Sequence, residues 1–141
     1  MSDLTPEKFL ADVKNHRMTV HQDTGVMRHV EFSGQPGSWD EKFFLTTWPG
    51  YLCVSGTMGC FVFARIPDML DFFRRADFHF DRSYWAQKVV AKDDAGVKKF
   101  SKFTETFLWC CYAIVWGIQQ YDAAKGTPTG SNESPIVGET P

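Results

Sequence analysis

Two carboxylates and an imidazole alternate with two rings in the segment Asp77-Phe78-His79-Phe80-Asp81. If the segment is extended, the polar side chains project from one face and both rings from the other. Carboxylates and imidazoles are ligands for divalent metal ions. One extended segment seldom supplies a whole metal site, so an amphipathic segment that docks through its rings, with Asp81 capping the next helix, is the favoured interpretation. We expect no metal and no cofactor.

His21 and His29 are a second possible pair of ligands, because both fall on one face of a predicted hairpin. A zinc site would need a cysteine or a third histidine placed beside them. The only cysteines in predicted strands, Cys53 and Cys60, belong to another hairpin and to no CxxC unit. We therefore expect the histidines to be a surface pair.

The four cysteines are Cys53, Cys60 and the adjacent pair Cys110 and Cys111. The chain does not open with a basic segment followed by an apolar one, as a secretory signal peptide does. We expect reduced thiols in a cytosolic compartment, where free cysteine packs as a small apolar side chain.

Two short motifs that carry chemistry in other proteins fall in predicted turns of this one. Asp23-Thr24-Gly25 is the triplet of retroviral-type aspartic proteases, but it follows polar residues rather than an apolar strand. Gly56-Thr57-Met58-Gly59 fits the GxxG pattern of KH domains, but it lies between two strands rather than two helices. Both are interpreted as turns.

Charge and aromatic residues point to a binding surface instead. Residues 65–102 hold nine lysines and arginines against six acids, a net charge of +3. Within this stretch, Arg74 and Arg75 follow Phe72 and Phe73, and arginine beside exposed aromatic residues is typical of protein-binding sites. A solvated helical face would give the same pattern.

Aromatic residues make up 16% of the chain, and four of them lie at the ends of predicted elements. These four are Trp39, Trp48, Tyr84 and Trp85. Rings at such positions could form a partner surface, line a small-molecule cleft, or cover the ends of a small core.

The elements that must position these residues form an α+β fold, with an antiparallel sheet of four to five strands and helices packed on one face. Predicted strands cover residues 17–22, 26–33, 42–48, 51–55 and 60–65. Predicted helices cover residues 5 to about 15, 68 to about 75, 83–91 and 101 to about 121. In the second hairpin, the predicted register places Leu52, Val54, Phe61 and Phe63 on the core face.

The chain of 141 residues is expected to form one domain over residues 1–121, followed by a flexible Gly/Pro/Ser-rich tail over 122–141. The longest apolar run, residues 107–118, is shorter than the roughly 20 residues that cross a bilayer, so it predicts a buried helix and no membrane partner. The net charge of −2 does not favour direct binding to nucleic acid.

Several sequence blocks resemble small proteins that are common in phage and prophage genomes, over roughly residues 5–105. The blocks are Thr47-Trp48-Pro49-Gly50-Tyr51-Leu52, Ser55-Gly56-Thr57-Met58-Gly59, Phe61-Val62-Phe63-Ala64-Arg65, Pro67-Asp68-Met69-Leu70-Asp71-Phe72-Phe73 and Ser83-Tyr84-Trp85. That family has no established activity, so no catalytic residue carries over. The resemblance implies a viral origin and expression in the cytoplasm of a host bacterium. Small phage proteins of this kind are often inhibitors of host defence, anti-CRISPR proteins among them.

Three functions follow as hypotheses. The first is a non-enzymatic phage protein that binds and blocks a host protein complex, such as a CRISPR effector, through Trp39, Trp48, Arg74, Arg75, Tyr84 and Trp85. The second is a module that binds a nucleotide or another small ligand in an aromatic cleft. The third is a metal-dependent enzyme that uses Asp77, His79 and Asp81.

Overall fold

The computed structural model describes residues 4–34, 40–92 and 105–126, and these residues form the predicted α+β fold with one strand more than expected. A single antiparallel sheet contains six strands, and four helices accompany it within the described residues. The strands are β1 (Arg17–Thr24), β2 (Met27–Ser33), β3 (Phe43–Trp48), β4 (Tyr51–Gly56), β5 (Phe61–Ala64) and β6 (Val89–Lys92). The helices are α1 (Pro6–Val13), α2 (Met69–Phe73), α3 (Arg82–Gln87) and α5 (Glu105–Ala124).

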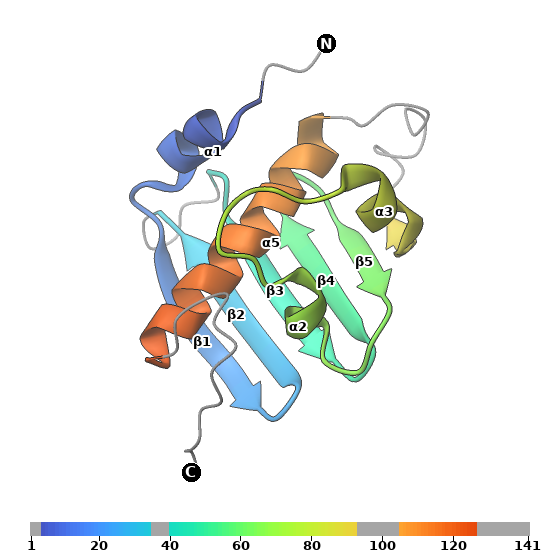
Figure 1. Ribbon diagram of the computed structural model, residues 1–141. Helices are drawn as coiled ribbons and strands as arrows, with labels where there is room; N and C mark the ends of the chain where they lie inside the picture. Colours follow the sequence, from blue (N-terminus) through green and yellow to red (C-terminus); the bar gives the residue numbers. More distant parts are fainter. Residues whose placement is uncertain (1–3, 35–39, 93–104, 127–141) are drawn as a thin grey trace.

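The strands lie side by side in the order of the sequence, so each pairs with the next along the chain (Figure 1). The β4–β5 hairpin has the predicted register, with Leu52 opposite Phe63 and Val54 opposite Phe61. All four side chains are buried, which confirms the predicted core face. The turn at residues 56–59 holds glycine at both ends with positive φ, as expected of a hairpin turn rather than a KH loop.

Helix α5 crosses one face of the sheet and supplies much of the core (Figure 1). Its Phe107 ring meets Phe61 edge-on at 5.2 Å, and its Trp109 ring meets Phe43 at 5.6 Å. Helix α1 packs against α5 through Phe9, whose ring lies 5.0 Å from Trp109. The apolar run is therefore a buried helix, and no helix in the described ranges is long and apolar enough to cross a membrane.

We call the sheet face opposite α5 the outer face. Its side chains come from alternate positions on the strands, so they are largely half-buried where their neighbours are fully buried. They include His29, Phe44, Thr46, Trp48, Tyr51, Cys53 and Val62.

The β1–β2 hairpin differs from its prediction in the turn. The expected loop was residues 23–25, but Thr24 pairs with Met27 and encloses a two-residue turn. A β-bulge at residue 21 takes up the change in register. As a result, Asp23 lies opposite Arg28 on the side of the sheet that faces α5.

Two further boundaries differ from the sequence-based expectation. The predicted helix over 83–91 ends at Gln87, and residues 89–92 form β6 against β5, because Val89 and Val90 favour an extended chain. At the other end of the core, α5 continues to Ala124, so the buried Asp122 belongs to the folded domain and not to a tail. Residues 127–141 lie outside the described residues.

Candidate functional site

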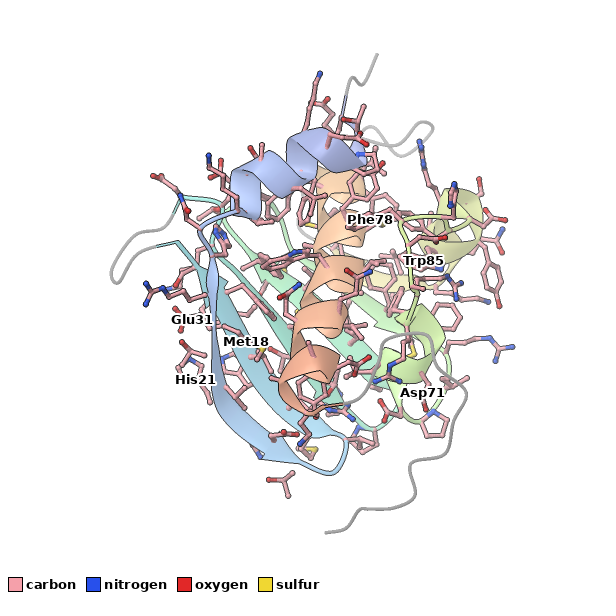
Figure 2. All side chains as sticks on the ribbon, turned by 60° about the vertical axis from the view of Figure 1, so that its left-hand side comes forward. Met18, His21, Glu31, Asp71, Phe78 and Trp85 are labelled. Carbon is pink, nitrogen blue, oxygen red and sulfur yellow. The ribbon has the colours of Figure 1, made fainter. Side chains whose placement is uncertain are left out.

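The segment 77–81 holds its place through its two rings, as the favoured interpretation predicted. Phe78 contacts the rings of Phe9 and Tyr112 at 6.1 and 5.4 Å, beside α5 in Figure 2. Phe80 stacks on Trp85 with a centroid separation of 4.3 Å. The backbone thus presents the alternate, polar side chains to solvent.

The three polar side chains of this segment have local partners. Asp77 accepts a hydrogen bond from the backbone N–H of His79 at 3.0 Å, and Asp81 accepts one from the N–H of Tyr84 at the start of α3. The His79 side chain is 93% exposed, and its Nδ1 lies 3.4 Å from the other Asp77 oxygen. Across the described ranges, no three His, Cys, Asp or Glu side chains are grouped to hold a metal ion.

The two adjacent arginines have different roles. Arg74 donates two hydrogen bonds to Asp122, from Nε at 2.7 Å and Nη2 at 3.0 Å, and a third to Asp71. These contacts outweigh burial and raise the pKa of Arg74. Arg75 instead lies over the face of Trp85 at 5.8 Å. Arg74 therefore ties α2 to α5, and of the pair only Arg75 remains a contact candidate.

A second arginine, Arg28, lies near the β1–β2 turn and hydrogen-bonds side chains at the edge of the core. Arg28 donates to both carboxylate oxygens of Asp68 at 3.0 Å and to the Tyr121 hydroxyl at 3.1 Å. Tyr121 in turn donates to Asp23 at 2.8 Å, and Lys125 donates to the other Asp23 oxygen at 2.9 Å. The aspartate of the protease-like triplet is therefore occupied by structural contacts. Asp23 and Thr24 end β1 and only Gly25 lies in the turn, so the interpretation of the whole triplet as a turn is wrong.

Burial alone would raise the pKa of both carboxyl groups in this cluster. The hydrogen bonds from Arg28 outweigh burial at Asp68, and those from Lys125 and Tyr121 outweigh it at Asp23, so both pKa values lie below their usual range. Both groups are thus held as carboxylates, which suits ion pairing and does not suit proton transfer near neutral pH.

A cavity of about 10 Å³ lies between α5 and the sheet, with Phe32, Leu45 and Gly117 among its lining residues. It has room for about one water molecule. A nucleotide does not fit there, and neither Trp48 nor Tyr84 lines it. The cavity therefore supplies no argument for the small-ligand hypothesis.

The four aromatic candidates separate into three groups. Trp85 is fully buried against Phe73 and Phe80, so the expected partial exposure is wrong for this ring. Tyr84 is exposed and Trp48 is half-buried on the outer face. Trp39 lies outside the described residues.

Three rings and two cations lie on neighbouring segments at one corner of the sheet, between the β3–β4 turn and the end of α3. Trp48 stacks on Tyr51 at 5.3 Å across the β3–β4 turn. Tyr51 pairs across strands with Ala64, whose N–H donates to the Lys88 carbonyl at 3.0 Å. The Lys88 ammonium lies 4.8 Å from the centre of the Tyr84 ring. Together with Arg65, which follows Ala64, we call Trp48, Tyr51, Arg65, Tyr84 and Lys88 the aromatic–basic corner.

The corner carries two exposed rings next to positive charge. Tyr51 and Tyr84 are each 38% exposed. Arg65 hydrogen-bonds the Tyr84 hydroxyl and, with the Lys88 charge, lowers the pKa of Tyr84. Sequence reasoning identified Trp48 and Tyr84 but missed Tyr51, Arg65 and Lys88. The β4–β5 register could have indicated two of these, because it sets Tyr51 opposite the residue before Arg65.

The histidine pair lies at the opposite end of the outer face. His21 and Glu31 project away from α5 in Figure 2, and His21 Nε2 lies 2.7 Å from a Glu31 oxygen. His29 stacks on Phe44 at 5.2 Å and hydrogen-bonds Thr46 at 2.8 Å. The pair is a surface cluster, as expected.

Comparison of the chain with protein-family models, with curated proteins and with solved structures found no match in any of the three.

Proposed function

We propose that this protein is a non-enzymatic binding protein that attaches to a partner protein complex and blocks it by covering part of its surface. The observation that carries the proposal is the aromatic–basic corner, where Tyr84 is exposed beside Arg65 and Lys88 and Tyr51 is exposed on the strand next to β5. Tyrosine, tryptophan and arginine are the residues that most often dominate binding energy at protein interfaces.

The charge of the corner defines the surface it would recognise. Arg65 and Lys88 are cations, and neither takes part in an ion pair among the described residues. An acidic patch with an aromatic or aliphatic pocket would complement both the charges and the rings. The resemblance to phage proteins makes a host defence complex, such as a CRISPR effector, the proposed partner.

The proposal is tested by capturing a complex from a host lysate, purifying it, and measuring its affinity for variants of this protein. We expect Arg65→Glu combined with Tyr84→Ala to weaken binding by at least about tenfold, since hot-spot residues each contribute roughly 2 kcal/mol. The same variant should lose inhibition of the captured complex to a similar extent.

A matched control carries two charge reversals on an unrelated surface. Lys8→Glu combined with Lys14→Glu alters exposed lysines next to or within α1 and should leave affinity unchanged. Circular dichroism must show that both variants are folded. Equal affinity for the corner variant and the wild type would reject the corner as the binding surface.

A further inference from the structure

Two thiols of the β4–β5 hairpin lie close together on the outer face. Cys53 lies on β4, and Cys60 immediately precedes β5. Their sulfur atoms are 4.0 Å apart. Both residues are half-buried rather than enclosed, and neither is in a disulfide. The two residues belong to no CxxC unit, and the register predicted for this hairpin, which the structure has, brings them to one face.

We propose that Cys53 and Cys60 form a dithiol–disulfide pair that a small disulfide, such as oxidised glutathione, converts reversibly to the disulfide. A disulfide requires the sulfurs to approach to about 2.05 Å, so they must close the remaining gap within the hairpin. The backbone ladder between β4 and β5 pairs Cys53 with Val62 and ends at Phe61, so Cys60 is diagonal to Cys53, one residue beyond the last pair. Disulfides of intracellular proteins are usually transient ones of this kind.

The reaction proceeds by two thiol–disulfide exchanges. The Cys60 thiolate attacks one sulfur of the oxidant, forms a mixed disulfide and releases one thiolate of the oxidant. Cys53 loses its proton to solvent and attacks the Cys60 sulfur, which releases the second thiolate. Two cysteine thiols are oxidised and the small disulfide is reduced to two thiols.

The order of attack follows from the surroundings of Cys53. Burial and the neighbouring Cys60 raise the pKa of the Cys53 thiol to about 12. A thiol that keeps its proton is a poor first nucleophile but can donate a hydrogen bond to its neighbour. We therefore assign the first attack to Cys60 and the resolving step to Cys53.

The other two cysteines provide an internal control. Cys110 and Cys111 are adjacent on α5 and are both buried. Successive side chains on a helix diverge by about 100°, so these thiols cannot be joined without unwinding α5. Burial also raises the pKa of Cys111 well above its usual range. They should stay reduced whenever the protein is folded.

The test equilibrates the reduced, folded protein with buffers of increasing oxidised-to-reduced glutathione ratio, followed by acid quenching, alkylation and mass spectrometry. We expect the monomer to lose two hydrogen atoms and two of its four alkylatable thiols, and the digest to contain a linked Cys53–Cys60 peptide. Reduced glutathione should reverse the change. Cys53→Ser should instead accumulate a lasting glutathione adduct on Cys60, because its resolving thiol is absent.

Three results would overturn the proposal. The first is a wild type that keeps four thiols, or a stable glutathione adduct, at every ratio tested. The second is a linked peptide that contains Cys110 or Cys111. The third is a disulfide that joins two molecules. Circular dichroism of the oxidised protein separates a reaction of the folded state from one that follows unfolding. The test needs no binding partner, so its outcome is independent of the proposed function.

Discussion

Arg74 and Arg75 show how far a residue's role depends on contacts that are distant in sequence. The two arginines follow the same pair of phenylalanines, and their local sequence assigns both to a binding surface. Arg74 reaches Asp122, a partner 48 positions away, and only the packing of α2 against α5 reveals this contact. Trp85 is a similar case, because the rings that bury it come from α2 and from the segment before α3.

Replacing Arg74 by alanine should destabilise the protein by roughly 3 kcal/mol, the low end of the range for breaking a buried ion pair. The variant is destabilised because Asp122, whose side chain is only 4% exposed, loses both hydrogen bonds from the guanidinium group. The low end of the range applies because the Arg74 side chain itself is 24% exposed. Urea unfolding measures the change. Arg75→Ala is the matched control and should cost about 1 kcal/mol or less, the contribution of one cation–π contact. Equal losses for the two variants would contradict these different roles.

The Asp68 carboxylate, which Arg28 holds, makes the stability of the protein sensitive to acid. Because the pKa of Asp68 is lower in the folded than in the unfolded protein, the unfolded state binds more protons as pH falls. The stabilisation is complete above about pH 4, near the unfolded pKa, and is lost as pH falls through the folded pKa. Asp23 and Glu31, whose pKa values are also lowered, act in the same direction.

Asp68→Asn should therefore reduce stability at pH 7 by about 1.5–3 kcal/mol and flatten the decline of stability below pH 4, since asparagine can still cap α2 but carries no charge. Urea unfolding at a series of pH values measures both effects. The control is Asp81→Asn, which makes the same change at the cap of α3 and leaves the ion pair between Asp68 and Arg28 intact. A wild-type pH profile in Asp68→Asn would show that this pair does not contribute.

At the scale of elements, the hairpins were more predictable than the edges of the sheet. Turn residues and alternation are local signals, and they placed β3, β4 and β5 to within a residue or two and gave the face of the β4–β5 hairpin. Strand β6 was missed because its four residues follow α3 with only Lys88 between them, and its extended form depends on pairing with β5. The bulge in β1 left no local signal either, since its effect is to turn Asp23 toward α5, where Tyr121 donates to it from a position 98 residues away.

The approach of α5 to the sheet depends on one small residue. A Cβ atom at Gly117 would lie 2.7 Å from a Leu45 methyl group and 3.2 Å from the Phe32 ring. Gly117→Val should therefore destabilise the protein by about 1–3 kcal/mol through overpacking, as measured by thermal or urea unfolding. Ala123→Val places the same side chain on the exposed end of α5 and should cost only a few tenths. A loss at Gly117 no larger than the loss at Ala123 would contradict overpacking, because valine is a better helix former than glycine and a poorer one than alanine.

For the whole molecule, the arrangement of faces limits where a partner can bind. The core face is filled by α5 and the rings that surround it, while the outer face carries half-buried side chains and ends in the aromatic–basic corner. The α+β class was predictable because alternation in the strands and the apolar stripe of α5 are both visible in the sequence. The corner was not, because it joins the β3–β4 turn to the region of α3, two parts that only the completed sheet brings together.

The order of the elements also has a consequence for synthesis on the ribosome. All six strands precede α5 in the chain, and every strand pairs with its neighbour in sequence, so the sheet can assemble strand by strand as it emerges. Its apolar face, including Phe32, Leu52 and Phe63, then waits for α5 to leave the exit tunnel. The nascent chain is thus most prone to chaperone capture and to aggregation in the interval between synthesis of β6 and of α5.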